Sequence, residues 1–450
     1  MSIGNLRDQG NQGNNFPYQL KNLQLLGAIN DNVIANKTPI VSLAPMATDA
    51  FGRQRVSEPL TLFDSSHRYS DNNLWSTAVA SGGTAVFSPN EGLVNLNVDT
   101  TNGSQVLRET IKVFSYQPGK SLLVLNTFVM APAQTNLRQR VGYFGLDNGL
   151  YLELNNSVVS FVERSLVTGL VTETKISQFG GVYGPSDTGW NVDKLDGTGP
   201  SKLTLDISKA QILFMDIEWL GLGTVRLGFV INGQFVLCHT FDHANIITST
   251  YITTASLPLR YEITNTGVTA NPSTLKQVCS TVISEGGYEL RGAQQAVGTP
   301  ITAARTFAAA GTFYPIVGIK LLSTRLDAIV IVTAISILGT GNGKNYAWRI
   351  IQSGTISGGL WVPVGANSSV EYNLTGTSAT GGRILAQGYV NSSNQASPSI
   401  NILKEALFAN QLERNSFTGT AHEFIVEVAV ATTSGGEGVY ASVDWEEISR

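Results

Sequence analysis

The stretch LTLDISKAQILFMDIEWLGLGTVRLGFVINGQFVLCHTF, residues 203–241, decides the fold, because two turn signals divide it into three strands. The first turn spans residues 221–223, with the sequence GLG. The second is Asn232-Gly233, a dipeptide that accepts positive φ at both positions and therefore favours a type I′ hairpin. The stretch is predicted to form a tight antiparallel meander.

The two turns also predict the register of the meander. Ile217 would face Leu227, and Leu227 would face Cys238 on the next strand. One face is then almost wholly apolar and would be buried against a second layer, each large side chain contributing roughly 1.5–3 kcal/mol. The residues on this face are Leu213, Met215, Ile217, Trp219, Val225, Leu227, Phe229, Ile231, Val236 and Cys238.

The opposite face of the meander is half polar and is the candidate ligand site. In the predicted register Glu218, Arg226 and His239 form one row across the three strands, and Asp216 lies two residues before Glu218 on the same face. A sheet that is apolar behind and half polar in front is typical of a β-sandwich whose front face holds a ligand.

Short strands separated by turns continue on both sides of the meander and predict an all-β fold with two antiparallel, jelly-roll-like β-sandwiches. The first sandwich is assigned to residues 60–265 and the second to residues 275–450, because the run NTGVTANPS interrupts the pattern between them. Only Ile402 to Leu412 has helical spacing in the second part. The clearest strands are Gly92–Val98, Val106–Phe114, Ser121–Met130, Arg140–Leu146, Leu150–Leu154, Val158–Arg164, Leu170–Ser177, Leu326–Leu338, Asn345–Ile351, Gly359–Val364, Ser369–Leu374, Arg383–Val390, Phe424–Ala431 and Val439–Trp445.

Residues 1–59 are predicted to form an extended arm and connector rather than a domain. The first sixteen residues consist mainly of Gly, Asn and Gln and have almost nothing to bury. After Pro17, three leucines recur at near-helical spacing and predict a short amphipathic helix, which either packs on its own chain or docks onto a partner protein. The candidate attachment residues are Phe16, Tyr18, Leu20, Leu23 and Leu26.

Composition excludes several classes of function. Charged residues make up 14% of the chain, the net charge is −4, and the basic residues are scattered singly, so no nucleic-acid partner is expected. The most apolar run, Ala328 to Leu338, is about half the length of a membrane span and is read as a buried strand. The N-terminus lacks the layout of a signal peptide, and two cysteines give no disulfide framework.

Motifs for catalysis and for cofactors are missing from the sequence. His239 and His243 flank Asp242, but on one strand they would lie about 13 Å apart, too far to share a metal ion unless the chain turned sharply. Asp216 and Glu218 have the spacing of paired carboxylates in some sugar-cleaving sandwiches, which makes a glycan depolymerase the alternative function. Arg226 would lower the pKa of Glu218 and make it a poor general acid. With the missing motifs and the wide spacing of the histidines, this leads us to expect no enzyme, no cofactor and no metal site.

A Gly-rich segment between Phe179 and Pro200 is too rich in turn formers to be a strand and is predicted to be a long loop. Loops of this length are often functional. Its aromatic residues, Tyr183 and Trp190, would either stack on a sugar ring or cap the end of the sandwich.

Three blocks of the sequence resemble virion structural proteins of large tailed bacteriophages, cyanophages among them. The blocks are GNQGNNFPYQLKNLQLL near the start, DAFGRQRVSEPLTLFDSSHRY from Asp49, and the stretch from Leu195 to Phe241, in that order. The resemblance covers roughly the first 265 residues. It implies a fibre, baseplate or capsid-decoration protein with a sandwich similar to the legume-lectin jelly roll, and it brings no catalytic residues.

Together these observations predict a non-enzymatic virion protein that is assembled in the host cytoplasm. Its N-terminal arm would bind other virion proteins, and its sandwiches would be displayed for binding of host-surface glycans. Because the front face and the C-terminal strands carry more apolar residues than a monomer should expose, a homotrimer is expected.

Overall fold

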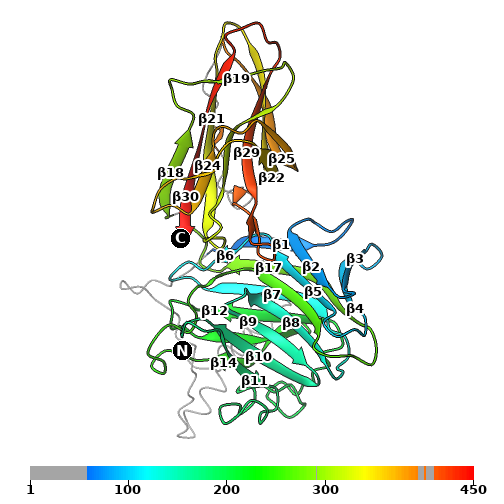
Figure 1. Ribbon diagram of the computed structural model, residues 1–450. Coiled ribbons are helices and arrows are strands. Elements are labelled where there is room, and N and C mark those ends of the chain that lie inside the picture. The colour runs from blue at the N-terminus through cyan, green and yellow to red at the C-terminus, as the bar shows by residue number, and fades with distance from the viewer. Residues whose placement is uncertain (1–57, 290, 394–399, 402–409, 450) are drawn as a thin grey trace, which may run out of the picture. The chain divides into compact units, whose positions relative to one another are not determined.

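The structure is a computed structural model that describes residues 58–289, 291–393, 400–401 and 410–449. The predicted all-β class is confirmed, since strands and no α-helices make up the regular structure of these residues (Figure 1). The predicted N-terminal helix lies outside the described residues, as does most of the segment with helical spacing, Ile402 to Leu412. The described part of the chain holds no helix with the length and apolar character of a membrane span.

The first sandwich consists of two antiparallel sheets, here called the β12 sheet and the β9 sheet. The β12 sheet has the order β14-β13-β12-β7-β17-β4-β3, and β1 also pairs with β17. Its strands are β14 (Gln234–Phe241), β13 (Val225–Ile231), β12 (Gln211–Ile217), β7 (Leu122–Val129), β17 (Ser273–Ser284), β4 (Leu93–Val98), β3 (Thr84–Ser88) and β1 (Leu60–Ser66).

The β9 sheet forms the opposing layer and has the order β11-β10-β9-β8-β16-β5-β2. Its strands are β11 (Thr172–Ser177), β10 (Val158–Ser165), β9 (Gly149–Asn155), β8 (Leu137–Phe144), β16 (Leu259–Asn265), β5 (Gln105–Thr110) and β2 (Trp75–Ala80). A short pair, β6 (Phe114–Ser115) and β15 (Ser256–Leu257), lies outside both sheets.

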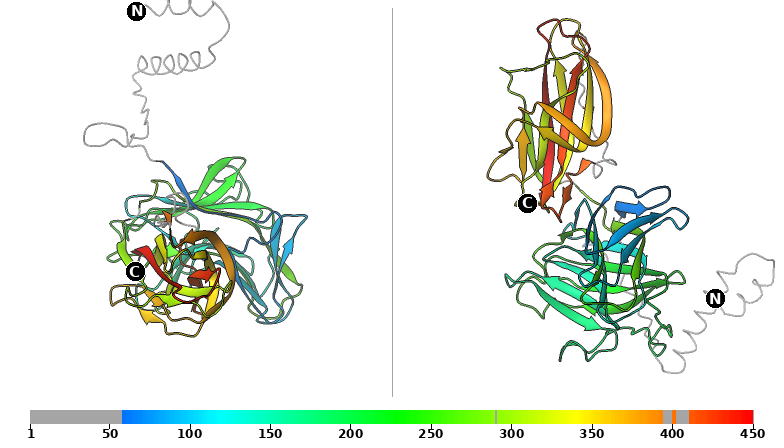
Figure 2. Two further views of the ribbon diagram at one scale, coloured as in Figure 1. Left: turned by 90° about the horizontal axis from the view of Figure 1, so that it is seen from above. Right: turned by 45° about the vertical axis from the view of Figure 1, so that its right-hand side comes forward.

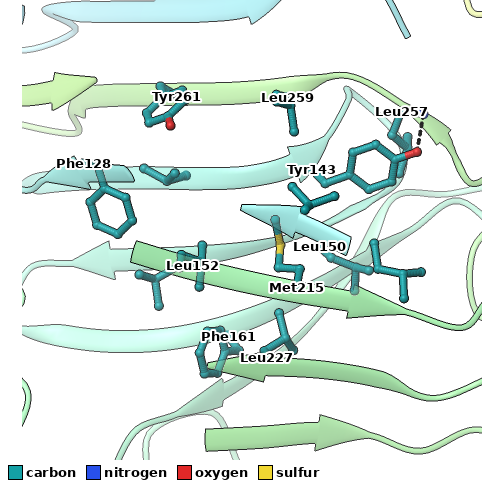
Figure 3. Packing of buried hydrophobic residues seen from close by; sticks show 14 of the residues in the cluster. Phe128, Tyr143, Leu150, Leu152, Phe161, Met215, Leu227, Leu257, Leu259 and Tyr261 are labelled. Atoms are coloured by element: carbon teal, nitrogen blue, oxygen red, sulfur yellow. Dashed lines mark hydrogen bonds between the residues drawn. The ribbon is translucent and has the colours of Figure 1, made fainter. Parts of the chain in front are cut away.

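The core of the first sandwich lies between the inner faces of these two sheets. Met215 and Leu227 from the β12 sheet face Leu150, Leu152 and Phe161 from the β9 sheet, and all five are buried (Figure 3). The period of two along each strand places alternate side chains in this core, as the burial of every second residue of β7 shows. Apolar alternation therefore predicted both the class and the buried face.

The register of the meander differs from the predicted register in two places. At the hairpin tip the prediction is confirmed: Phe229 lies opposite Val236, and Asn232 and Gly233 have φ of 52° and 75°. On the other side, Ile217 lies opposite Val225 instead of Leu227, because residues 218–224 form a wider connection that the N–H of Glu218 closes onto the Thr224 carbonyl at 3.1 Å. This slip of two residues leaves every side chain of β12 on its predicted face.

The second difference is a β-bulge, and it does change a face. The pairing shifts between Leu227 and Gly228, so Leu227 lies opposite His239 where Cys238 was predicted. The extra residue of a bulge reverses the alternation beyond it. His239 and Phe241 therefore point inward together with Cys238, and Thr240 points outward, opposite Arg226.

The boundary between the sandwiches lies further along the chain than predicted. Residues 273–284 form β17, which pairs with β7 and β4 inside the β12 sheet, so the first sandwich does not end at residue 265. The run NTGVTANPS is the connection between β16 and β17, which belong to opposite layers. The second sandwich begins with β18 (Ala293–Gly298).

The second sandwich also has two antiparallel layers, here called the β30 sheet and the β29 sheet (Figure 2). The β30 sheet has the order β18-β30-β21-β26, and β19 (Arg305–Thr306) also pairs with β30. Its other strands are β30 (Gly438–Ser449), β21 (Ile329–Gly339) and β26 (Ile400–Asn401).

The β29 sheet has the order β23-β24-β20-β29-β22-β25. Its strands are β23 (Val362–Pro363), β24 (Val370–Asn373), β20 (Tyr314–Leu321), β29 (Glu423–Val430), β22 (Asn345–Ser357) and β25 (Ser378–Asn391). Two further short strands, β27 (Arg414–Asn415) and β28 (Thr420–Ala421), pair only with each other. Alternate residues of β29 and β30 belong to one core: Phe424, Val426, Val428 and Val430 of β29, and Val439, Ala441, Val443 and Trp445 of β30.

Candidate functional site

The predicted polar row on the front of the meander is only partly present. Asp216 on β12 lies directly opposite Arg226 on β13, and the two side chains form an ion pair. Glu218 lies beyond the end of β12 and is exposed, so the predicted pair of Glu218 with Arg226 is wrong. The slip of two residues in the β12–β13 register gives Asp216 the position that the prediction assigned to Glu218.

His239 does not lie on the front face at all. Its side chain is inside the sandwich, with the residue 5% exposed, because the β-bulge turns it inward. Its Nδ1 accepts a hydrogen bond from the N–H of Asn191 at 3.3 Å, and its ring lies edge to face with Phe241 at 4.6 Å. Burial lowers the pKa of His239 to about 4, so the ring is neutral at physiological pH.

His243 has surroundings of its own. Its Nε2 lies 2.7 Å from the carboxylate of Glu163, its Nδ1 lies 2.6 Å from the carbonyl of Gly223, and its ring stacks on Tyr251 at 4.0 Å. Burial alone would lower the pKa of His243, but the hydrogen bond and charge of Glu163 outweigh it and raise the pKa. His239 and His243 thus have different partners, and the described residues contain no group of three potential metal ligands.

Two buried carboxylates hold the Gly-rich loop of residues 179–200. Asp187 accepts hydrogen bonds from the N–H groups of Ser177, Val182 and Tyr183 at 2.9, 2.9 and 3.0 Å. Burial would raise the pKa of Asp187, but these bonds and that of the Ser177 hydroxyl lower it. Asp193 accepts in the same way from the N–H groups of Leu195 and Ser201 at 2.9 and 2.8 Å. The loop is therefore built around its own aspartates.

The two candidate aromatic residues of this loop, Tyr183 and Trp190, lie on different sides of the β9 sheet. Trp190 is 2% exposed and stacks on Phe161 in the core, with the ring centroids 4.5 Å apart. Of the two predicted roles, this position corresponds to capping the sandwich and not to stacking on a sugar. Tyr183 is half-buried on the outer face, where its hydroxyl lies 3.4 Å from that of Ser160 and its ring lies 5.8 Å from the Lys175 ammonium.

The outer face of the β9 sheet carries a network of ion pairs that sequence reasoning missed. Lys175 on β11 contacts the carboxylates of Glu153 at 2.8 Å and Glu173 at 3.0 Å, and Arg164 contacts Glu173 at 2.7 Å. A second group joins Arg138 and Arg140 on β8 to Glu262 on β16. We call these seven residues the charged face: Arg138, Arg140, Glu153, Arg164, Glu173, Lys175 and Glu262.

Two acids of the charged face, Glu173 and Glu262, are poor proton donors. Burial would raise the pKa of Glu173, but hydrogen bonds from Tyr151 and Lys175 outweigh it and hold the pKa at about 2. The same balance lowers the pKa of Glu262, where the charge of Arg140 opposes burial. A general acid needs a pKa near the working pH. These carboxylates are held as acceptors for the neighbouring cations.

The second sandwich brings a serine, a histidine and a carboxylate together without forming a catalytic triad. The Ser353 hydroxyl donates to Glu413 at 2.9 Å and lies 3.1 Å from Nδ1 of His422. Glu413 lies 3.9 Å from the same nitrogen. In a triad the hydroxyl and the acid contact different ring nitrogens, so that the proton passes through the imidazole. This geometry does not provide that path.

A cavity of about 740 Å³ opens next to the connection between β12 and β13. Its lining includes Trp219, Tyr116, Lys120, Thr253 and Thr254, and the rings of Trp219 and Tyr116 meet edge to face at 5.8 Å. Trp219 is therefore half-buried at the rim of a cavity, where the prediction placed it wholly in the core. We call this site the Trp219 cavity.

No protein-family model matches the sequence, and a comparison with curated proteins gives no match. The solved structures that are similar to about half of the chain include the following three. The carbohydrate recognition domain of Emp47p has 13% identity and a TM-score of 0.30, with coverage of 53% of this chain and 99% of that domain. A protein of unknown function, SO2946 from Shewanella oneidensis MR-1, has 12% identity, a TM-score of 0.33 and coverage of 54% and 93%. The Crh5 transglycosylase has 13% identity, a TM-score of 0.30 and coverage of 52% and 90%.

Proposed function

We propose that this chain is a non-enzymatic structural protein of a tailed-bacteriophage virion that displays two β-sandwiches and binds glycans of the host surface. The virion part rests on the three blocks of sequence that resemble phage structural proteins. Phe16, Tyr18, Leu20, Leu23 and Leu26, the attachment residues of this proposal, lie outside the described residues. The binding part rests on the first sandwich.

The observation that favours a binding function over a catalytic one is the contrast between the charged face and the Trp219 cavity. On the charged face each acid is paired with at least one cation, and the pKa values of Glu173 and Glu262 are lowered. The cavity instead combines an indole ring with threonine hydroxyls and a lysine, beside an exposed ion pair of Glu289 and Arg291. An apolar ring with a few converging polar groups is the usual composition of a small-molecule site.

Binding is tested with the full-length chain on an array of bacterial surface polysaccharides. We expect binding of at least one polysaccharide that Trp219→Ala abolishes and Trp219→Phe weakens, because the phenyl ring keeps part of the stacking surface. Release of reducing ends from a bound polysaccharide, lost in Asp216→Asn or Glu218→Gln, would replace this proposal with the depolymerase alternative.

The virion part is tested by deleting residues 1–40 from the phage gene. The truncated chain should fold as before, because the described sandwiches begin after these residues, but it should be missing from purified particles. Normal copy number of the truncated protein in particles would place attachment elsewhere.

A further inference from the structure

The outer face of the β29 sheet carries an aromatic trough on the second sandwich. Three strands that lie side by side, β25, β22 and β29, bring Tyr389, Ala347 and Ala429 into one row across the sheet (Figure 1). Phe313, just before β20, continues this row, because the next residue, Tyr314, pairs with Val428 of β29. A cavity of about 610 Å³ is lined by all four residues, which we call the Tyr389 trough.

The side chains of this row are large at its two ends and small in its middle, which leaves space above the sheet. The two aromatic residues stand three strand spacings apart, about 14 Å between their backbones. Between them, the alanines rise only one carbon above the sheet. Tyr389 is 89% exposed, so its ring borders the cavity on one side and does not cover it. The result is an apolar floor with an aromatic ring at each side.

The ends of the trough are polar but carry no net charge. At one end Asn345 and Asn391 pair across β22 and β25, and the Asn391 amide donates to the Asn345 carbonyl oxygen at 2.6 Å. At the other end the guanidinium of Arg349 lies over the Phe313 ring at 4.1 Å. Its charge is balanced by the buried carboxylate of Glu427 on the neighbouring strand.

We propose that the Tyr389 trough binds one residue of a neutral glycan. A pyranose has an apolar face of C–H groups, which suits stacking on Tyr389 or Phe313, and a rim of hydroxyls, which suits the amides of Asn345 and Asn391. Neutral sugar fits better than acidic sugar, because the residues that line the trough carry no charge and Arg349 is already paired. The cavity volume lies within the range of about 300–1,000 Å³ that is usual for small ligands.

This site is separate from the Trp219 cavity, and its assignment rests on the glycan-binding part of the proposed function. Saturation-transfer NMR on the full-length chain tests it with the methyl glycosides of glucose, galactose and N-acetylglucosamine as neutral probes and N-acetylneuraminic acid as the acidic probe. We expect Tyr389→Ala to weaken binding of a neutral probe at least about tenfold, and Tyr389→Phe to change it by less than about threefold.

Two further variants separate the trough from general surface effects. Ala347→Leu fills the floor while it leaves Tyr389 in place, so it should also weaken binding of a neutral probe at least about tenfold. Tyr69→Ala removes another strongly exposed tyrosine, from the first sandwich, and should have no effect. All three alanine and leucine variants change exposed or half-buried positions, so their thermal unfolding midpoints should match that of the wild type.

Other outcomes would overturn the assignment. Neutral-probe binding that survives Tyr389→Ala but is lost in Trp219→Ala refutes the trough and leaves the proposed function intact. No binding of any probe by the wild type argues against both. Binding of the acidic probe alone refutes the neutral class. A change of oligomeric mass in Tyr389→Ala, measured by light scattering, would show that a second copy of the chain occupies the trough.

Discussion

The inward position of His239 has a measurable consequence for stability below neutral pH. Its pKa is lowered to about 4 by burial, against about 6.5 in an unfolded chain. Below pH 6.5 the unfolded state therefore binds the proton more readily than the folded state. The stability associated with neutral His239 is fully present above pH 6.5 and is lost progressively as the pH falls towards 4.

The size of this effect follows from the two pKa values. At pH 5 nearly all unfolded chains carry the proton on His239 and few folded chains do, so the folded state loses roughly 2 kcal/mol relative to pH 7.5, or about thirtyfold in its unfolding equilibrium. His239→Gln keeps a hydrogen-bond acceptor for the N–H of Asn191 and removes the titration. The variant should therefore lack this part of the pH dependence, whatever its stability at pH 7.5.

The neighbouring thiol of Cys238 provides a local assay, because it is buried in the same core and is free. In a Cys279→Ser background, labelling by 4,4′-dithiodipyridine in moderate urea reports the opening of the first sandwich. The ratio of wild-type to His239→Gln labelling rates should rise about thirtyfold from pH 7.5 to pH 5. Comparing the two proteins at each pH cancels the pH dependence of the reagent.

His243 supplies a control of opposite sign. Its pKa is raised by Glu163, so its contribution is fully present below pH 6.5 and is lost as the pH rises through the folded-state value. Acidification should therefore destabilise His243→Gln more than the wild type and His239→Gln less. Equal pH dependence in the wild type and His239→Gln would refute the inward position of His239, and with it the β-bulge.

Three further predictions concern packing, charge and assembly. Trp190→Ala should cost about 3–5 kcal/mol, measured by the urea midpoint, because it empties a closed site against Phe161, and Trp219→Ala should cost clearly less because Trp219 is half-exposed. Glu218→Ala should change stability by less than about 1 kcal/mol in the same titration; a larger loss would mean that Glu218 has a structural partner. Light scattering should give about three times the chain mass of 48.1 kDa, and a monomer at micromolar concentration would contradict the trimer.

Alternation along single strands was sufficient to predict the fold class, most strand positions and the buried face of the meander. The slip of two residues between β12 and β13 does not affect these predictions. A shift by an even number of residues leaves the same side chains facing inward. The slip did, however, exchange Glu218 for Asp216 as the partner of Arg226. Cross-strand partners depend on loop geometry, and the Gly-rich connection of residues 218–224 permits more than one length.

The β-bulge left a signal in the sequence that strict alternation hides. In a regular strand Cys238 and Phe241 would face opposite sides, yet both are apolar and both are buried. An odd spacing between two buried side chains requires one extra residue between them. The spacing of these two apolar residues is therefore the sequence signal that places His239 off the front face.

The domain boundary and the charged face were missed for another reason, since both depend on contacts between distant segments. A polar turn such as NTGVTANPS has the same composition whether the next strand returns to the same sandwich or begins a new one. The charged residues of the outer face alternate visibly in LRQRVGYF and TETKIS, but the pairing of β8 with β16 and of β10 with β11 is needed to show that opposite charges meet.

The charged face limits the chemistry that the first sandwich can support. Lys175 serves Glu153 and Glu173 at once, and the side chain of Glu153 is fully buried, so removing this cation would leave a buried carboxylate without its partner. Such a loss costs more than an exposed ion pair contributes, because the buried charge keeps its desolvation penalty. Raising the pKa of Glu173 towards the working pH of a general acid would likewise require the loss of its cation partners, Lys175 and Arg164. The network that stabilises the outer face of the β9 sheet therefore holds Glu173 and Glu262 as ionised acceptors. This is one reason that we propose a ligand site at the edge of this sandwich, in the Trp219 cavity.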